Sequence, residues 1–551
     1  MTRRHTYSRM RLFVITLSFT LFATAGWYAY RELMSPKPCN VIILTVESLR
    51  DDRIGTGMTP NLLTIAQEGY RFTNHRAISG WTGSNIISIL TGLSPYETGV
   101  HTRGQSLSPE RQTPLMKMQD LGYRVEGIQG FMGMDIYKNT GLTVRPQTDN
   151  PLYWLALRKK EQEPFFFWYH YVHTHLPYSS PQKYETGIFD DLRDKRLPAD
   201  QHQRLEQVLK QSAVHYKSIT FQKEDIPLVH QLQASTIREF DDWFADFWRF
   251  LNKSGLRDNT ILVVTADHGD EHGERGLVGH ASTTQLGHLH EEIVRLPLFV
   301  WLPPDVQVKN QEVNTSLDSN HEDIMPTIFG LLNIKAEKSC AGRDLFRDPS
   351  PSPWKAMTSS GGFAEEDTDN IRYFEYATKI KHHKLLLKIT KEGKESARLF
   401  DLQQDPNEKT DISSRHPERV REMTDILRPL IKSRTHMPAR QSETALAETG
   451  EQPYWLYPAT GKEYGYNDMQ DRFTLEWSGS VNENYVLEYQ AGEGVSQITG
   501  RLDVKGNKKD FGTISRRYWQ TWLVAKSPIR VRVRQTGSSL WSEWLHLEIK
   551  P

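Results

Sequence analysis

Four runs of apolar residues, each ending in polar side chains, stand out along the first half of the sequence. Such continuous apolar runs are typical of strands that are buried on both faces of a parallel sheet. The first run stops at Glu47, the second continues into a group of histidines, and the third stops at Asp267 and His268. The predicted strands lie within residues 41–46, 164–178, 259–269 and 295–303.

Amphipathic segments separate these runs. "TPNLLTIAQEGYRFTNH" places Leu62, Leu63, Ala66 and Tyr70 at helical spacing, and residues 235–255 form an amphipathic pattern closed by a glycine. Strands that alternate with helices predict an α/β fold, in which a mostly parallel sheet is sandwiched by helices. Sites in such folds lie at the carboxyl ends of the strands, where the polar clusters stand.

The rest of the chain predicts smaller units. Residues 185–230 are charged and helical in pattern, which indicates a surface insertion. From about residue 370 short strands and basic loops indicate a smaller C-terminal subdomain, so that the large α/β domain, with this subdomain, spans 38–432. Residues 433–452 are polar and predict a linker.

In residues 453–551 the pattern of apolar and polar positions repeats every two residues. "RFTLEW", "NYVLEY" and "IRVRVR" alternate apolar with polar positions and are separated by turn residues. This pattern predicts a small β-sandwich. Arg530, Arg532 and Arg534 form a row that either binds an anionic partner or is the solvated face of a strand.

The N-terminus has a basic start and an uncharged apolar stretch at 12–30. Nineteen residues are just enough for one membrane-spanning helix. We expect a signal anchor within residues 1–37 that holds the catalytic domain on the periplasmic or extracytoplasmic side of a bacterial inner membrane. A signal peptide cleaved after the small residues 23–25, which would release a secreted protein, is the alternative. A buried core helix is a third interpretation.

Charge and cysteine content exclude some functions. Lysine plus arginine and aspartate plus glutamate are both 68, so net charge gives no support for nucleic-acid binding. Two cysteines, Cys39 and Cys340, cannot form a disulfide framework or a cysteine-rich zinc cluster. They either form one bridge or are buried thiols.

The strand ends carry groups that bind metal ions. Glu47, Asp267 and His268 combine carboxylates with an imidazole, which suits zinc or manganese; calcium or magnesium are further possibilities. "SGWTGSNIISILTGLSPYETGVH" adds Thr82 before an apolar run. By itself this threonine is most simply a helix N-cap.

Seven segments in order resemble the sulfatase branch of the alkaline phosphatase superfamily, over roughly residues 38–430. They are "NVIILTVESLRDDRIG", "ILTGLSPYETGVH", "PFFFWYHYVHTHLPY", "LRDNTILVVTADHGDEHGERGLVGH", "LHEEIVRLPLFVWLP" and the pair "HEDIMPTIFGLL" and "ARLFDLQQDPNEKTDI". The resemblance implies that the family's nucleophile falls at Thr82.

The sequence departs from true sulfatases at that position. Sulfatases carry a cysteine or serine that is oxidised to formylglycine, and threonine cannot form this aldehyde. Ile86 replaces the arginine of their motif, and Glu47-Ser48 replaces their paired aspartates. The combination of Glu47, Thr82, Asp267 and His268 instead resembles the metal-binding residues of the phosphoethanolamine and phosphoglycerol transferases of the same superfamily. This resemblance implies one divalent metal ion bound by four ligands: Glu47, Thr82, Asp267 and His268.

Histidines complete the predicted site. The resemblance implies that His175 and His280 take part in catalysis and that His170 binds substrate. His173 and His288 are further candidates for substrate binding. The alternative for His173 is that it lies on the opposite face of the strand, and the alternative for His288 is that it is a residue on a helix surface.

The sequence therefore predicts a membrane-anchored, metal-dependent enzyme that hydrolyses or transfers a phosphoester group through a covalent Thr82 intermediate. A lipid head group or a surface glycan is the expected substrate. A sulfuric ester hydrolase that works without formylglycine, and an inactive scaffold presenting the C-terminal β-domain, are the alternatives. That domain resembles a fibronectin type III domain whose last hairpin is "VRVRQTGSSLWSEW".

Overall fold

The structure is a computed structural model that describes the following residues: 38–55, 57–101, 105–128, 135–145, 150–159, 161, 163–214, 218–284, 286–306, 308, 313–335, 340–360, 372–434, 452–458, 462–464, 473–491, 498–511, 529–536, 538 and 540–549. The predicted signal anchor at 12–30 lies outside them, as does most of the predicted linker. Within these ranges, no helix is both long and apolar enough to cross a bilayer.

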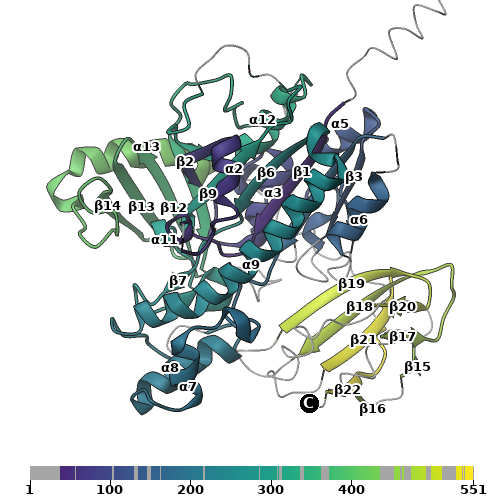
Figure 1. Cartoon of the computed structure of the whole chain (residues 1–551). Helices are drawn as coiled ribbons and strands as arrows, with labels where there is room; N and C mark the ends of the chain where they lie inside the picture. Colours follow the sequence, from purple (N-terminus) through teal and green to yellow (C-terminus); the bar gives the residue numbers. More distant parts are fainter. Residues whose placement is uncertain are drawn as a thin grey trace, which may run out of the picture. The chain divides into compact units, whose positions relative to one another are not determined.

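An eight-stranded sheet forms the centre of the catalytic domain, in the order β10-β2-β9-β6-β1-β5-β3-β4 (Figure 1). All of its pairs are parallel except those made by β9, which runs antiparallel to both β2 and β6. The strands are β1 (Asn40–Val46), β2 (Tyr70–Arg76), β3 (Arg124–Ile128), β4 (Thr143–Arg145), β5 (Phe165–Tyr171), β6 (Thr260–Ala266), β9 (Arg295–Trp301) and β10 (Ser319–Asn320). The predicted mostly parallel α/β sheet is confirmed.

Helices cover the sheet because its central strands are apolar on both faces. Every residue of β1 and β6 is buried. On one face, Ile42 and Leu44 pack in one cluster with Phe240 and Phe244 of the long helix α9, which crosses the front of the sheet in Figure 1. The helices of the domain core are α2 (Leu63–Glu68), α3 (Thr82–Thr91), α4 (Pro95–Thr98), α5 (Pro114–Asp120), α6 (Pro151–Arg158), α9 (Ile226–Ser254), α10 (Ala281–Thr284), α11 (Glu291–Val294) and α12 (Ile324–Leu331).

The helical pattern around Tyr70 is interrupted in the structure. Helix α2 ends at Glu68, Gly69 follows, and Tyr70 begins β2, which pairs with β9. A Cβ atom on Gly69 would lie 2.6 Å from the carbonyl oxygen of Val300, so this close approach of the backbone requires glycine. Pairing with β9 therefore overrides the helical spacing.

The charged segment 185–230 contains α7 (Gly187–Arg193), α8 (Ala199–Lys210) and the start of α9. It has an apolar cluster of its own, in which Ile188 and Leu205 pack with Leu232 of α9. Tyr178, which follows β5, belongs to the same cluster. The segment therefore packs against the residues that follow the carboxyl end of β5.

The smaller subdomain is a four-stranded antiparallel sheet covered by one helix. Its strands are β11 (Trp354–Ser359), β12 (Tyr373–Ile380), β13 (His383–Thr390) and β14 (Glu395–Asp401), and its helix is α13 (Pro417–Arg434). Leu385 and Leu387 of β13 pack against Met423 and Leu427 of α13. The sheet begins earlier than the predicted boundary near residue 370, because β11 pairs with β12.

The C-terminal segment forms two small sheets, β15-β17-β20 and β16-β22-β21-β18-β19. Their strands are β15 (Trp455–Tyr457), β16 (Lys462–Tyr464), β17 (Thr474–Trp477), β18 (Asn484–Ala491), β19 (Ile498–Lys505), β20 (Lys508–Asp510), β21 (Ile529–Gln535) and β22 (Leu545–Ile549). The apolar positions Leu475, Trp477 and Val531 share one buried cluster, as their alternation predicts. The resemblance to a fibronectin type III domain stays a prediction.

The arginine row of β21 has partners within the domain. The guanidinium carbon of Arg532 lies 4.4 Å from the ring centroid of Trp541 and 4.5 Å from that of Trp544, and Arg534 lies 5.0 Å from Trp541. Arg532 also forms an ion pair with Glu488. These contacts within the domain account for Arg532 and Arg534, so no anionic ligand from outside the domain is needed to explain the two arginines.

Candidate active site

Neighbouring parallel strands bring the predicted metal ligands together. Val46, the last residue of β1, is in register with Ala266 of β6 on one side and with Tyr171 of β5 on the other. Glu47 follows β1, and Asp267 and His268 follow β6, so their side chains emerge at the same edge of the sheet. His268 Nε2 lies 3.3 Å from Asp267 Oδ2 and 3.4 Å from Glu47 Oε1.

The backbone around Ser48 holds Asp267 in place. Ser48 has a φ of 56°, in the left-handed region that is uncommon for residues other than glycine. Its N–H donates to Asp267 Oδ1 over 3.0 Å, and the N–H of His268 donates to the same oxygen over 2.9 Å. With Oδ1 bound in this way, Oδ2 is directed at the site. A strained residue at this position is typical of functional sites.

Thr82 is the first residue of α3 and stands in the middle of the group. Its Oγ1 lies 2.9 Å from His268 Nε2 and 3.4 Å from Glu47 Oε1. The N-cap of α3 is Trp81, so the side chain of Thr82 is directed at the site and does not cap the helix. A Cβ atom on Gly83 would lie 2.3 Å from the indole of Trp81, so glycine is needed next to the nucleophile position.

The arrangement fits a divalent cation. Glu47 Oε2 and Asp267 Oδ2 are buried and accept no hydrogen bond from the described residues. Burial, followed by the charge of Asp267, raises the pKa of Glu47 well above its usual value. Burial also opposes ionisation of Asp267, but the charges of His268 and His170 outweigh it and lower the pKa of Asp267 to about 2. Two adjacent buried carboxylates that each keep one oxygen without a hydrogen bond are best neutralised by a metal ion.

The ring of His268 is fixed in the orientation that a metal ligand needs. Its Nδ1 lies 3.0 Å from the carbonyl oxygen of Gly269. A carbonyl oxygen only accepts, so Nδ1 carries the proton and Nε2 presents its lone pair toward Thr82 and the carboxylates. Histidine ligands in proteins are commonly held by such a partner on the other ring nitrogen. Glu47, Thr82, Asp267 and His268 thus come together as predicted, and their binding of a metal stays a prediction.

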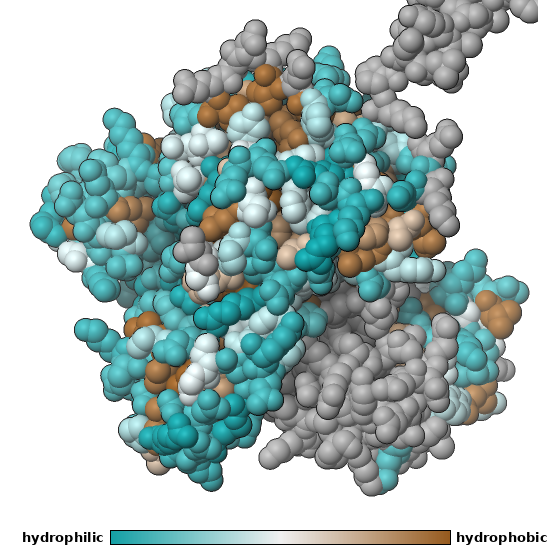
Figure 2. Space-filling view, viewed as in Figure 1, coloured by the Kyte–Doolittle hydropathy of each residue, from teal (hydrophilic) through white to brown (hydrophobic). Residues whose placement is uncertain are grey.

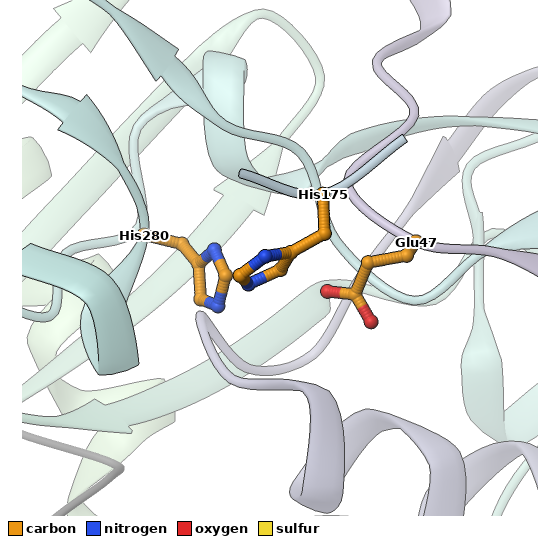
Figure 3. A group of neighbouring side chains, drawn as sticks. All are labelled: Glu47, His175 and His280. Atoms are coloured by element: carbon orange, nitrogen blue, oxygen red, sulfur yellow. The ribbon is translucent and has the colours of Figure 1, made fainter. Parts of the chain in front are cut away.

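His175 and His280 lie beside this group (Figure 3). One ligand atom from each lies within 4.8 Å of the others and of Glu47, and the three side chains point toward one another in Figure 3. His175 Nδ1 contacts the carbonyl oxygen of Leu176 over 2.5 Å, which places the proton on Nδ1. Both histidines therefore lie beside Glu47, and their roles in catalysis stay predictions.

Asp270 is a functional candidate that the sequence analysis did not identify. Its Oδ1 lies 2.8 Å from His280 Nδ1, and its Oδ2 accepts a hydrogen bond of 2.8 Å from the hydroxyl of Tyr178. Burial raises the pKa of Asp270 to about 6, although His175 and His268 act in the opposite direction. The signal in the sequence was the position of this acidic residue directly after "DHG". Its role follows only from the tertiary structure, which places Asp270 against the ring of His280.

The remaining predicted histidines lie in different surroundings. The side chain of His170 is fully buried, with Nε2 3.0 Å from Glu47 Oε2 and 3.9 Å from Asp267 Oδ2. It lies against the predicted metal ligands, a position that suits a ligand or a supporting residue better than contact with substrate.

The structure does not bring His173 or His288 to this group. The side chain of His173 is 47% exposed, and its Nδ1 lies 3.7 Å from Glu239 Oε1. His288 Nε2 lies 3.0 Å from Glu271. No contact joins either ring to Thr82 or Glu47 within the described part of the chain. Their binding of substrate stays a prediction that the geometry does not support.

Known proteins share this fold and these segments. The chain is 24% identical over 474 residues to an arylsulfatase of Clostridium perfringens, covering 71% of this chain and 93% of the relative. It is 23% identical over 218 residues to the multifunctional alkaline phosphatase superfamily protein PehA of Trinickia caryophylli, covering 36% of this chain and 40% of that protein.

Among solved structures, the phosphonate monoester hydrolase of Agrobacterium radiobacter superimposes with a TM-score of 0.54 at 18% identity, covering 75% of this chain and 99% of that one. The sequence model of the sulfatase family matches residues 39–334, which contain every residue of the site described above. Because this match spans more than half of the 551 residues, the chain belongs to the sulfatase family, a family of hydrolases in the alkaline phosphatase superfamily.

Proposed function

We propose that the protein is a metal-dependent phosphoesterase or phosphotransferase that acts through a covalent intermediate on Thr82. One observation carries this proposal. The Thr82 hydroxyl stands 2.9 Å from His268 Nε2 and 3.4 Å from Glu47 Oε1, inside the predicted metal-ligand group. A structural threonine at a helix start would not require this position.

Threonine also argues for phosphorus chemistry. The sulfatase nucleophile is an aldehyde hydrate, and the secondary alcohol of threonine cannot be oxidised to an aldehyde. A hydroxyl group is a weak nucleophile at its ordinary pKa and needs activation. A divalent ion held by Glu47, Asp267, His268 and Thr82 itself would lower the pKa of this hydroxyl and offset the charge of the carboxylates.

The residues of the chain then divide the reaction into two displacements. In the first, Thr82 Oγ1 releases its proton to solvent water and bonds to phosphorus, while the bond from phosphorus to the ester oxygen breaks. His280 or His175, in its protonated form, gives a proton to the departing oxygen. In the second, the oxygen of water or of an acceptor hydroxyl bonds to phosphorus, its proton passes to the same histidine, which is now neutral, and the bond to Thr82 breaks. Water as acceptor makes the enzyme a hydrolase, and an organic hydroxyl makes it a transferase.

The start of α3 supports anion binding. Thr82 is the first residue of this ten-residue helix, whose first backbone N–H groups have no partner within the helix. Such a terminus favours a negatively charged phosphoryl group. Asp270 acts as a positioning residue in this scheme, because its contact with Nδ1 orients the ring of His280.

The expected substrate is a lipid head group or a surface glycan. This part of the proposal rests on the apolar stretch at 12–30, which would hold the enzyme at the outer side of a membrane. Hydrolysis of sulfuric esters is a second candidate function, favoured by the sulfatases among the relatives, such as the ulvan-active sulfatase of Formosa agariphila. In that case Thr82 would attack sulfur without prior oxidation.

The purified full-length protein, reconstituted with zinc or manganese, tests both candidates on phosphodiesters, phosphomonoesters and sulfate esters. We expect phosphoester turnover, and with a slow substrate a phosphoryl mass increment on the peptide that contains Thr82. Ser84→Ala is the matched control, because the Ser84 hydroxyl donates to the carbonyl oxygen of Val100 over 2.8 Å and not to the site. Turnover of sulfate esters alone would favour the second candidate and reject the first.

A further inference from the structure

We propose that the smaller subdomain carries a second transition-metal site, separate from the catalytic group. Its ligands are His382, His383 and Asp401, and His416 is the fourth donor. One ligand atom of each of the first three residues lies within 4.8 Å of the others. Imidazoles combined with a carboxylate suit zinc, which takes four such ligands in structural sites.

Strand pairing places these residues together. His383 begins β13 and is directly in register with Asp401, which ends β14, so the two side chains share one face of the sheet. His382 precedes β13 in the turn after β12, yet its ring centroid lies only 4.3 Å from that of His383. His382 Nε2 is 4.0 Å from Asp401 Oδ2. The turn therefore brings two consecutive side chains to one point, which an extended strand would separate.

The residue before helix α13 supplies the fourth donor. His383 lies on the same face of β13 as Leu385 and Leu387, and these leucines pack against α13. His416 immediately precedes α13 at Pro417, with its ring centroid 6.3 Å from that of His383. His416 is exposed, so a rotation of its side chain toward the ion displaces no buried group. A bound ion would join the turn, β14 and the start of α13.

The contacts of the neighbouring residues are compatible with a bound cation. Arg419 opposes a bound cation, but its guanidinium group is already engaged by Glu422 and by the carbonyl oxygen of Ile380. The turn N–H of Gln403 binds Asp401 Oδ1, which directs Oδ2 toward His382.

Another group of similar composition shows what excludes a metal. Arg53 donates to His230 Nδ1 over 3.1 Å, and Arg50 donates to His272 Nδ1 over 3.2 Å. Because a guanidinium group only donates, both Nδ1 atoms must accept, and each neutral ring carries its proton on Nε2. These rings have no lone pair left for a metal, although Glu274 is adjacent. Within the described residues, no arginine donates to the ring nitrogens of His382 or His383.

The visible surface of the subdomain is largely hydrophilic in Figure 2, around α13 and the ends of β13 and β14. An ion there would act as a structural element, because none of its ligands belongs to the catalytic group. Its removal should leave ester turnover unchanged and weaken the attachment of α13 to the sheet. This inference is thus independent of the activity proposed for Thr82.

Zinc content per chain tests the proposal. Full-length protein is equilibrated with buffered zinc, and bound zinc is measured by atomic emission after gel filtration. We expect the double variant His382→Ala/His383→Ala to bind one zinc ion fewer than the wild type, with unchanged turnover and a smaller zinc-dependent rise in Tm. The matched control His202→Ala changes a histidine of α8 outside every such group and should keep the wild-type content.

Two further variants make the result decisive. Glu47→Gln/Asp267→Asn removes the catalytic carboxylates, and this variant should still bind the zinc ion that His382→Ala/His383→Ala loses. His416→Ala changes an exposed residue, is therefore expected to fold, and should weaken that binding. Equal zinc content in the wild type and the double histidine variant would overturn the proposal, as would loss of all zinc when only the catalytic carboxylates are changed.

Discussion

The substitution of Thr82 separates a nucleophile from a structural threonine. An N-cap threonine supports a helix through its side chain, and its loss costs about 1 kcal/mol of stability without a direct effect on chemistry. Thr82 lies inside α3, after the N-cap residue Trp81, and its hydroxyl faces His268 and Glu47. Thr82→Ala should therefore leave the helix intact and remove only the site contacts.

The structure sets the expected magnitudes. Thr82 is 4% exposed, so alanine removes one buried methyl group and one hydrogen-bonded hydroxyl, each about 1 kcal/mol. The free energy of unfolding should fall by no more than about 2 kcal/mol. Loss of a nucleophile costs about 10³-fold or more in kcat, which corresponds to at least about 4 kcal/mol of transition-state stabilisation. The effect on activity thus exceeds the effect on stability. Thr82→Ser keeps the hydroxyl and should retain turnover within about tenfold, because only the methyl group is lost.

The assay combines kcat on the best phosphoester with urea unfolding of the same preparations. Ser84→Ala removes a neighbouring hydroxyl of α3 that binds Val100, so it controls for general damage to the helix. Full activity of Thr82→Ala would refute covalent catalysis through Thr82. Equal loss of activity in Thr82→Ala and Ser84→Ala would refute the specific role of this hydroxyl.

Three further predictions concern Asp270, the pH dependence of metal binding and the C-terminal segment. Asp270→Asn should lower kcat by about 10- to 100-fold with little change in KM, because His280 loses its charged partner; steady-state kinetics check this, and an unchanged kcat would contradict it. Burial lowers the pKa of His268, but Asp267 and Glu47 outweigh it and hold that pKa above its usual 6.5. Below this pKa the ring binds a proton in place of the metal, so zinc affinity of the catalytic group, measured by competition with a chelator, should fall about tenfold per pH unit on acidification. A chain that ends after residue 440 should keep its turnover of a small soluble ester, because the described members of the C-terminal cluster all lie within residues 455–547; a folded but inactive product would contradict this.

Local patterns in the sequence determined the sheet and the convergence of its strand ends. The apolar runs before Glu47 and before Asp267 predict buried parallel strands, and the carboxyl ends of adjacent parallel strands meet at one edge. This rule needs no knowledge of side-chain packing. It therefore predicted that Glu47, Asp267 and His268 come together. The resemblance to the superfamily added Thr82, and the structure shows these four side chains in contact.

Register and packing decided everything that depends on side-chain direction. His170, His173 and His175 are close in sequence, yet the first lies against the predicted metal ligands, the second faces Glu239 and the third lies beside His280. Their separation depends on where β5 ends and how the following turn bends, which the sequence pattern does not encode. Contacts such as that between Asp270 and His280, and the cluster formed by cross-strand pairing of His383 with Asp401, join residues through tertiary geometry. Apolar periodicity determines which face of an element is buried, whereas the partner of each polar group is decided only when the elements pack together.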